Sequence, residues 1–263
     1  MKIACIQLNA GNNKTANINK ALAFVRRAIY KKAELICLPE MFNYRGPFST
    51  KSTLDAVLER IPGESSLPFI EIARQQKVSI LLGSIYEKIP GKNKAFNTSL
   101  LISKTGTILA KYRKIHLFDA IVDNKHIRES KLFMEGRKRV VASLGGLTIG
   151  MSVCYDLRFP ELYQFYAREH CEVVTVPSSF TYRTGKAHWE VLLRARAIEN
   201  HVFVIAPNQT GKDGRGVLSY GNSMIISPWG DILARGSHDQ EEVLYADVER
   251  KSIVYVKKTF GKI

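Results

Sequence analysis

The chain has 263 residues, and its 39 lysines and arginines against 24 aspartates and glutamates give a formal net charge of +15. That length, with 45% hydrophobic residues, excludes a mini-protein, a disordered tail and a membrane channel. The basic residues occur singly, in pairs and in one triple at 137–139, so no run reaches the roughly five or six like charges of a binding tail. We therefore expect a single domain over residues 1–263, with no nucleic-acid partner.

The four cysteines, at positions 5, 37, 154 and 171, have no Cys-x-x-Cys spacing, and three of them lie in or beside apolar segments. Reduced, buried thiols are expected there. The opening MKIACIQLNA has too few apolar residues for a signal peptide, which needs about 7 to 15, or for a membrane helix of about 20. These features predict a cytoplasmic protein with no membrane partner.

Apolar strands and amphipathic helices alternate through the first half of the chain. IACIQL predicts a buried strand, and residues 17–32 place Ile18, Leu22, Val25 and Ile29 on one helical face. ELICLP predicts the next strand, and the loop EMFNYRGPF follows it. A helix over 67–77 then leads into VSILLGSIY, and NTSLLIS and TILAKYR are joined by the turn at 104–106.

The second half repeats this alternation. RVVASL and LTIGMSVC predict two strands, followed by a helix over 160–169, the strand EVVTVP, a helix over 187–200 and the strand HVFVIAP. NSMIIS, DILARG and EVLYADV predict three antiparallel strands at the end. Strands alternating with helices, with added hairpins, indicate an α/β fold, a four-layer α-β-β-α sandwich with two mixed sheets.

Three reactive side chains interrupt this pattern at the ends of strands. Glu40 follows ELICLP, Lys114 follows TILAKYR and Cys154 ends LTIGMSVC before a turn into a helix. Strand ends at one edge of an α/β sheet converge, so the three could meet. A raised-pKa glutamate can take a thiol proton, and an ammonium and a backbone N–H, notably that of Tyr155, can stabilise an oxyanion. The trio predicts acyl transfer through a thioester.

The segments LPEMF, YRKIHLFD and GMSVCYDLRFPELY, in that order, resemble the three signature motifs of the nitrilase (carbon–nitrogen hydrolase) superfamily. The likeness continues through PSSFTYRTGKAHWEVLLRARAIEN and SYGNSMIISPWGDILA. It implies Glu40 as general base, Lys114 as stabiliser of the tetrahedral intermediate, Cys154 as nucleophile and Glu129 as the carboxylate that orients the lysine and the amide. It also implies the α-β-β-α sandwich and a homodimer or higher homo-oligomer. Glu135 is a nearby alternative to Glu129.

Two histidines and two arginines near these motifs admit other roles. His116 and His188 could suggest a Cys-His dyad, but we expect His116 to be a structural hydrogen-bonder and His188 to pack or cap. Arg194 and Arg196, two apart on a helix, are expected to be surface or subunit-interface charges. The histidines and cysteines never fall at ligand spacing, so we expect no metal, and no cofactor.

The chain is most similar to the omega-amidase and deaminated-glutathione amidase branch. This resemblance implies a thiol-dependent amidase that hydrolyses a small carboxylate-bearing amide to an acid and ammonia. The alternatives are a nitrilase or an N-carbamoyl amino acid amidohydrolase using the same Glu-Lys-Cys site, or a non-catalytic basic nucleic-acid-binding protein. Residues in the turns around the nucleophile are expected to bind substrate: Tyr44, Tyr155, Arg158, Phe180 and Tyr182. The expected alternative for Arg158 is a buried pairing with Asp156 or Glu161.

Overall fold

The computed structural model describes residues 1–48, 51–122 and 125–261. Within this part of the chain, twelve strands form two six-stranded mixed sheets. The first sheet has, in spatial order, β16 (Glu242–Asp247), β1 (Lys2–Gln7), β2 (Leu35–Cys37), β3 (Ser79–Lys88), β4 (Ala95–Ile102) and β5 (Ile108–Arg113). The second has β15 (Ile232–Arg235), β14 (Met224–Ile226), β11 (Phe203–Ala206), β10 (Val173–Thr175), β9 (Leu147–Met151) and β8 (Val141–Leu144).

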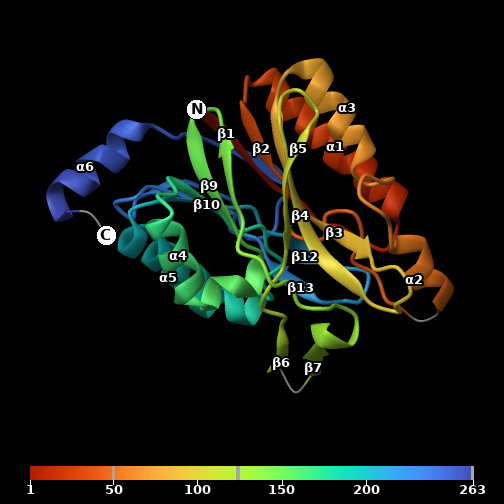
Figure 1. Cartoon of the computed structure of the whole chain (residues 1–263). Helices are drawn as coiled ribbons and strands as arrows, with labels where there is room; N and C mark the ends of the chain where they lie inside the picture. Colours follow the sequence, from red (N-terminus) through yellow and green to blue (C-terminus); the bar gives the residue numbers. More distant parts are fainter. Residues whose placement is uncertain (49–50, 123–124, 262–263) are drawn as a thin grey trace.

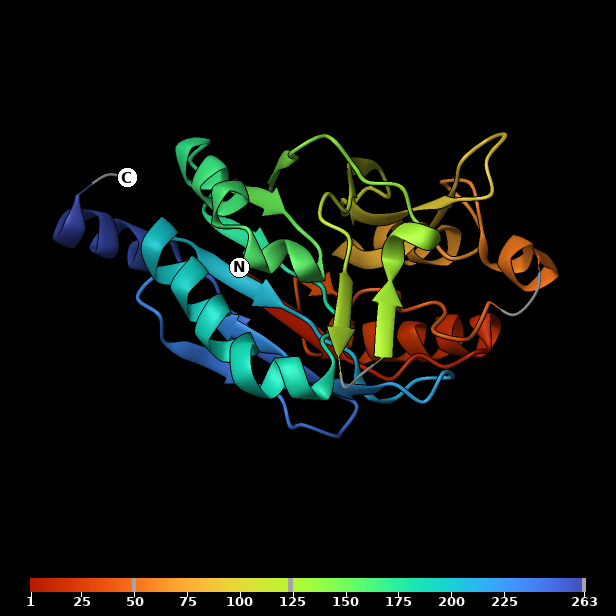
Figure 2. The ribbon, with the colours of Figure 1, turned by 90° about the horizontal axis from the view of Figure 1, so that it is seen from below.

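Helices cover the outer face of each sheet. Figures 1 and 2 show α1 (Lys14–Tyr30) and α3 (Leu67–Gln76) on one side of the molecule and α4 (Pro160–Arg168) and α5 (Tyr182–Asn200) on the other, with the sheets between them. The layers are therefore α-β-β-α, which confirms the expected fold class. The last helix, α6 (Arg250–Phe260), projects from the side of the sandwich (Figure 1). None of the helices described is long and apolar enough to cross a membrane.

The space between the sheets is filled by apolar side chains from both halves of the chain. Ile3 and Leu101 of the first sheet belong to the same buried cluster as Ile149 and Val173 of the second. A second buried cluster lies between the first sheet and its helices and includes Val25 and Phe69. Burying apolar side chains contributes roughly 25 cal/mol per Å² of area removed from water, and this holds the strand ends at fixed positions.

The last strand differs from the expectation of three consecutive antiparallel strands. β14 and β15 do pair antiparallel, but β16 crosses to the first sheet and pairs with β1, from Lys2 opposite Asp247 to Gln7 opposite Glu242. The reason is that β1 is almost wholly buried and would otherwise be an exposed apolar edge. β16 covers that edge.

Two helices begin earlier than the sequence pattern predicts. The expected start of the first helix was residue 17, but α1 begins at Lys14 because the side chain of Asn13 accepts a hydrogen bond from the Ala16 N–H, at 2.9 Å. The helix expected over 187–200 is α5, which begins at Tyr182 and includes Gly185. Gly185 lies against the Tyr220 ring, where a side chain would not fit.

Several short elements had no expectation from the sequence. They are helix α2, two hairpins (β6 with β7 and β12 with β13) and the 3-10 turn η1, whereas the 3-10 turn η2 lies where a turn was expected after Cys154. Their bounds are α2 Lys51–Val57, β6 Asp119–Val122, β7 Lys125–Arg128, β12 Thr210–Lys212, β13 Leu218–Tyr220, η1 Glu129–Lys131 and η2 Cys154–Arg158. Both 3-10 turns carry residues of the candidate site.

Candidate active site

Glu40 lies in the turn after β2, in a buried position between the two sheets. Its carboxylate Oε1 accepts hydrogen bonds from Asn97 Nδ2 at 2.8 Å and from Lys114 Nζ at 2.9 Å. The turn is held by Gln209 Nε2, which donates to the Glu40 carbonyl at 2.9 Å. Gly83 of β3 is required beneath it, because a Cβ there would lie 2.1 Å from the Leu38 and Pro39 carbonyl oxygens.

Lys114 directly follows β5 and is 1% exposed. Its ammonium donates to Glu40 and to both oxygens of Glu129, at 3.1 and 2.9 Å. Glu129 Oε2 also accepts from the Phe118 N–H at 2.8 Å. The lysine is therefore held between two carboxylates, those of Glu40 and Glu129. Glu135, the alternative, is exposed and lines a different groove, and in the described part of the chain it forms no hydrogen bond or ion pair with Lys114 or Glu40.

Cys154 is the first residue of η2, three residues beyond the end of β9, rather than the last residue of the strand as expected. Its φ of 50° is in the left-handed region, which a residue with a side chain adopts at a cost of order 1 kcal/mol. The Cys154 N–H donates to the Pro177 carbonyl at 3.0 Å. This sharp turn presents the sulfur at the edge of the sheet instead of packing it in the strand.

Asp156 ties the cysteine turn to the lysine strand. Its fully buried carboxylate accepts from the Val153 N–H at 2.9 Å, from the Tyr112 hydroxyl at 2.7 Å and from the His116 N–H at 3.0 Å. The His116 ring Nδ1 lies 2.7 Å from the same carboxylate. Tyr112 and His116 are two residues before and after Lys114, so a single carboxylate fixes both sides of the lysine relative to the turn of Cys154.

The electrostatics of the cluster are dominated by burial and by three charges. Burial, followed by the charge of Glu40, raises the pKa of the Cys154 thiol well above its usual range, whereas Lys114 and a hydrogen bond from the Ser179 backbone lower it. Burial alone would lower the pKa of Lys114, but the charges of Glu129 and Glu40 raise it well above its ordinary value. The lysine is therefore a fixed cation beside a protonated thiol.

A narrow pocket opens beside Cys154. It is lined by residues from η2, the loop before α5, the first turn of α5 and the segment between β5 and β6: Phe118, Cys154, Tyr155, Arg158, Ser179, Phe180, Thr181 and Thr184. The Arg158 guanidinium lies 5.8 Å from the centre of the Tyr155 ring and 5.5 Å from that of Phe180. Three of the five side chains expected to bind substrate thus line the same pocket.

The other two expected residues lie elsewhere. Tyr44 is buried in a separate cluster with Met41, Tyr86 and Phe133, and its hydroxyl donates to the Pro47 carbonyl. Tyr182, at the start of α5, is 38% exposed and packs its ring against Tyr220. Neither is among the residues that line the pocket beside Cys154.

Arg158 does not make the buried pairing with Asp156 or Glu161. Asp156 is occupied by Tyr112, His116 and Val153, and the Arg158 Nη2 instead lies 3.3 Å from Nδ1 of His188. Within the described residues, Arg158 forms no ion pair with a carboxylate. Its charge is therefore left uncompensated at the pocket.

The histidine expectations have different outcomes. His116 is a structural hydrogen-bonder, as expected, because its ring and backbone both contact Asp156 and its ring stacks on Phe159. His188 is exposed, so the expectation that it packs is wrong. Neither ring hydrogen-bonds Cys154 within the described part of the chain.

Arg196 was expected to be a surface or interface charge, and this is wrong. It is 6% exposed, its Nε donates to the Leu157 carbonyl at 3.1 Å, and its guanidinium lies over the Tyr163 ring. The Arg196 side chain therefore stabilises η2 through its hydrogen bond to Leu157. Arg194, in contrast, is partly exposed and donates to the Gly230 carbonyl.

Sequence reasoning missed seven residues of the site: Asn97, Asp156 and Gln209 around the catalytic side chains, and Phe118, Ser179, Thr181 and Thr184 in the pocket. Asn97 is a buried amide inside the strand β4, which is a usable signal because such groups need partners, whereas Gln209 stands in the polar stretch PNQTGK after β11. Asp156 is a charged residue two positions from the nucleophile that the structure buries completely. Thr184 carries no such signal, because it reaches the pocket only through the early start of α5.

Comparisons with known proteins agree with this geometry. Residues 2–258 match the family described as carbon-nitrogen hydrolase. The omega-amidase NIT2 of Homo sapiens is 36% identical over 258 residues, 98% of this chain and 91% of that protein. A deaminated glutathione amidase of Dictyostelium discoideum is 37% identical over 254 residues, 94% of this chain and 87% of that protein. The crystal structure of the C. elegans NitFhit protein superposes with a TM-score of 0.90 at 32% identity, covering 98% of this chain and 63% of that one.

These likenesses confirm the resemblance seen in the three motifs, and they extend it to nearly the whole chain. The relatives named as amidases support hydrolysis as the activity. The chain therefore belongs to the carbon–nitrogen hydrolase family of the nitrilase superfamily and is a hydrolase of carbon–nitrogen bonds other than peptide bonds.

Proposed function

We propose that the protein is a cysteine amidase that hydrolyses a small carboxylate-bearing amide to the acid and ammonia. One observation carries the proposal: Lys114 is hydrogen-bonded to both Glu40 and Glu129, and the charges of all three act on the Cys154 thiol. The pocket beside Cys154 also contains Arg158, which has no carboxylate partner among the described residues. Cys154 is assigned as nucleophile, Glu40 as general base, Lys114 as oxyanion stabiliser and Glu129 as the carboxylate that orients the lysine.

The first step forms the thioester. Glu40 takes the thiol proton, and the Cys154 sulfur attacks the amide carbonyl carbon to form a tetrahedral oxyanion. The Lys114 ammonium and the Tyr155 backbone N–H stabilise that oxygen. The carbon–nitrogen bond then breaks, and the leaving nitrogen takes the proton from Glu40 and departs as ammonia.

The second step releases the acid. Water attacks the thioester carbonyl carbon and gives a proton to Glu40, and the carbon–sulfur bond breaks. The thiolate regains its proton from Glu40, which returns the site to its starting state. Because Lys114 keeps its proton throughout, the same cation stabilises the oxyanion in both steps.

The substrate carboxylate is assigned to Arg158. This guanidinium lines the pocket of Cys154, has no carboxylate partner within the described residues and lies over Tyr155 and Phe180. Planar pairing with a carboxylate is the interaction guanidinium groups make best. Arg158→Gln should raise KM about 10- to 100-fold for a carboxylate-bearing amide, with a smaller change in kcat. An equal loss for an uncharged amide would contradict the assignment.

The function is tested by ammonia release from alpha-ketoglutaramate and by release of the amine cysteinylglycine from deaminated glutathione. Cys154→Ala should abolish release while the circular dichroism spectrum is unchanged, and Cys154→Ser should retain at most a trace. Full activity in Cys154→Ala would refute the mechanism. A panel that includes nitriles and N-carbamoyl amino acids separates the amidase from the two alternatives, because each rival predicts its own substrate to be turned over faster.

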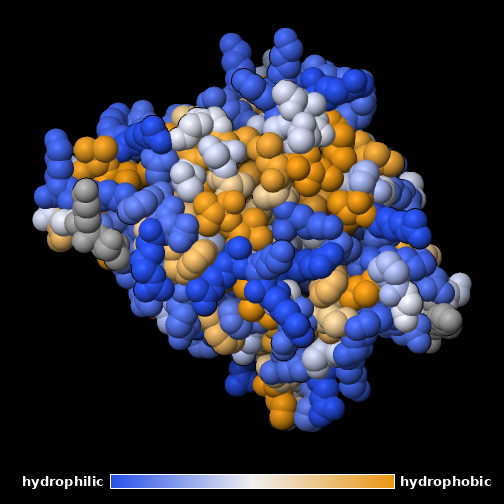
Figure 3. Space-filling view, viewed as in Figure 1, coloured by the Kyte–Doolittle hydropathy of each residue, from blue (hydrophilic) through white to orange (hydrophobic). Residues whose placement is uncertain are grey.

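We also propose that residues 1–263 act as one domain in a cytoplasmic homodimer. The buried core shared by both sheets supports one domain, and four free buried cysteines suit a reducing compartment. Exposed rings support the dimer: Trp229, Tyr255 and Phe260 are 45 to 64% exposed, and Trp229 stacks on Phe260 at a centroid distance of 5.3 Å and lies tilted against Tyr255 at 5.7 Å. Hydrophobic atoms are visible over α6 in Figure 3. Light scattering of wild type and Tyr255→Glu tests the dimer.

A further inference from the structure

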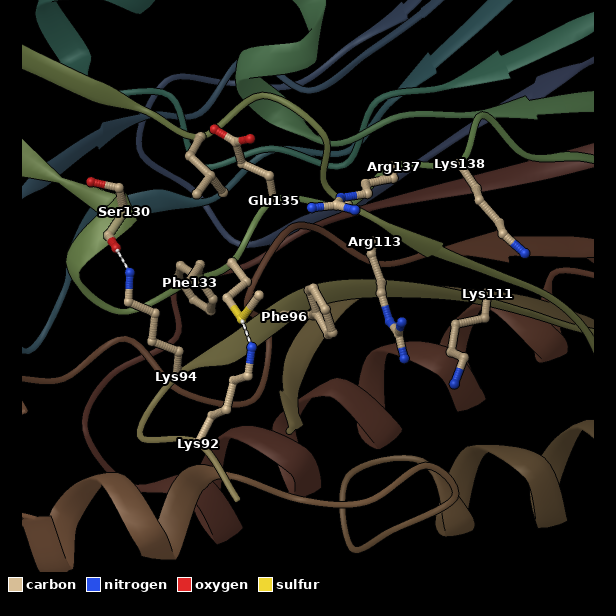
Figure 4. A pocket seen from close by; sticks show the side chains of 13 residues that line it. Lys92, Lys94, Phe96, Lys111, Arg113, Ser130, Phe133, Glu135, Arg137 and Lys138 are labelled. Atoms are coloured by element: carbon tan, nitrogen blue, oxygen red, sulfur yellow. Dashed lines mark hydrogen bonds between the residues drawn. The ribbon is translucent and has the colours of Figure 1, made fainter. Parts of the chain in front are cut away.

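A basic groove lies on the outer face of β4 and β5, away from the reaction centre. Its volume is about 870 Å³, and its walls come from the loop before β4, from β5 and from the segment 130–138 (Figure 4). Along β5, Lys111 and Arg113 line this groove, whereas Tyr112 and Lys114 point the other way, toward Asp156 and Glu40. The groove is therefore separate from the site of Cys154.

The groove is far richer in cations than the chain as a whole. Six of its 13 lining residues are basic, whereas the chain average of 39 in 263 would give about two. The six are Lys92, Lys94, Lys111, Arg113, Arg137 and Lys138. Figure 4 shows Arg113 and Lys111 together, Arg137 and Lys138 above them, and Lys92 and Lys94 at the other end. This arrangement gives an elongated row of cations rather than a point site.

Among the described residues, two of the six cations share a single carboxylate and the other four have none. Glu87 accepts from Lys111 at 3.0 Å and from Arg113 at 2.7 and 2.8 Å. Lys92 and Lys94 donate instead to uncharged atoms, the Met134 sulfur and the Ser130 carbonyl.

Arg137 and Lys138 make no ion pair or hydrogen bond within the described residues, and Glu135 is the one carboxylate that lines the groove there. Four cations held together without carboxylate partners repel one another, and an anion of several charges would relieve that repulsion.

The groove also limits which polyanion fits. A nucleic-acid strand would need exposed rings for base stacking. Phe133 is 3% exposed, and the face of Phe96 is covered by the Arg113 guanidinium at 4.1 Å, so neither offers a platform. The volume is in the range of about 300 to 1,000 Å³ typical of small-ligand sites. Lysine ammonium groups are point charges suited to phosphate oxygens.

We propose that this groove binds a linear chain of linked phosphates, either an inorganic oligophosphate or the triphosphate of a nucleotide. Lys92, Lys94, Arg137 and Lys138, which have no carboxylate partner among the described residues, contact the phosphates, and Arg113 and Lys111, held by Glu87, form the floor. This binding site is independent of the amidase reaction, and its test does not depend on turnover.

The test is calorimetric titration of the full chain with sodium tripolyphosphate at about 50 mM NaCl. We expect a 1:1 complex with a dissociation constant below about 100 μM, weakened roughly tenfold at about 200 mM NaCl because exposed charges are screened. The complex should also raise Tm in proportion to ligand concentration. No saturable binding below about 1 mM would overturn the proposal.

Matched double variants locate the site. Arg137→Ala/Lys138→Ala should weaken tripolyphosphate about tenfold. The control Arg26→Ala/Lys31→Ala removes the same two charges from exposed positions at the end of α1 and should change the affinity less than twofold. An equal loss in the control would mean that the net charge, not the groove, attracts the anion, and would refute the assignment.

Two further ligands separate the sources and the rivals. If ATP binds as tightly as tripolyphosphate, the ligand is the triphosphate of a nucleotide. If ATP binds much more weakly, the ligand is an inorganic oligophosphate. Both outcomes support the proposed phosphate site. Tighter binding of a thymidine decanucleotide or a glutamate decapeptide, lost in Arg137→Ala/Lys138→Ala, would assign the groove to another class of partner and overturn the proposal.

Discussion

Two consecutive cations at the end of β5, Arg113 and Lys114, lie on opposite sides of the strand and have different electrostatic surroundings. Lys114 is buried and hydrogen-bonded to two carboxylates, whereas Arg113, one residue earlier, is partly exposed on the basic groove and shares one carboxylate with Lys111. A buried charge needs compensation to be tolerated, and the compensation fixes its position. An exposed cation can remain in excess, which suits recognition of anions rather than chemistry.

The largest effect is expected for the substitution Lys114→Met. It removes the oxyanion donor and leaves Glu40 and Glu129 together without a cation. We expect kcat to fall about 10³-fold and the free energy of unfolding to fall by about 3 to 5 kcal/mol.

The matched control is Arg113→Met, the same loss of a cation one residue away. It should change kcat less than twofold and stability by about 1 kcal/mol. Steady-state kinetics and urea unfolding of both variants measure the contrast. Equal losses in the two variants would show that the face of the strand does not matter.

Glu129→Gln sharpens the role of the second carboxylate. Its charge raises the pKa of Lys114, so its removal should lower that pKa and move the alkaline limb of the kcat/KM profile to lower pH. At neutral pH we expect a loss of about 10²-fold. The pH profile is the deciding measurement, since an unshifted alkaline limb with reduced activity would mean a purely structural role.

Asp156→Asn tests whether one carboxylate aligns the two sheets at the site. The amide cannot accept from all the donors that now face it, so we expect a loss of about 2 to 4 kcal/mol of stability. Because the Cys154 turn would move relative to Lys114, kcat should fall about tenfold with little change in KM. A stability loss with unchanged kcat would limit Asp156 to folding.

The smallest effect is expected at Glu87, the buried carboxylate that Lys111 and Arg113 of the basic groove share. Burial would raise the pKa of Glu87, but hydrogen bonds from Arg113 and Lys111 lower it to about 2, below the ordinary 4.5. A lowered pKa stabilises the fold above about pH 4.5, and this contribution is lost as the pH falls toward 2. Glu87→Gln should therefore be less stable by about 1 to 3 kcal/mol at pH 6, and the difference should shrink toward pH 2.

The control for Glu87 is Glu135→Gln, on the wall of the same groove. It should leave stability unchanged across this pH range, and neither variant should alter kcat. A difference between Glu87→Gln and wild type that stays constant with pH would contradict the assigned cause.

Much of the fold and the reacting trio could be predicted from local sequence. Apolar periodicity located most strands and helices, and Glu40, Lys114 and Cys154 stand out because each follows a strand with a reactive group. Elements without periodicity were missed, as with the β12–β13 hairpin. The partner of β16 was also missed, since only the burial of β1 decides it.

The features that the sequence did not reveal are formed by residues far apart in the chain that come into contact only in the folded protein. Asp156 becomes a buried tie only because Tyr112 and His116, some 40 positions away, reach it across the two sheets. The basic groove forms only when residues 92–94, 111–113 and 137–138 are brought together, although the total charge is plain from composition. There, Gly136 lets the segment lie against β5, because a Cβ at this position would be 2.0 Å from the Arg113 carbonyl oxygen.

The central claim is that Cys154 carries the acyl group, and mass spectrometry of the protein mixed with a turned-over amide and quenched in acid tests it most directly. We predict a mass increase equal to the acyl group minus one hydrogen, on the peptide that contains Cys154, and no such adduct in Cys154→Ala. Turnover of the amide with the adduct on another residue, or undiminished in Cys154→Ala, would contradict the account.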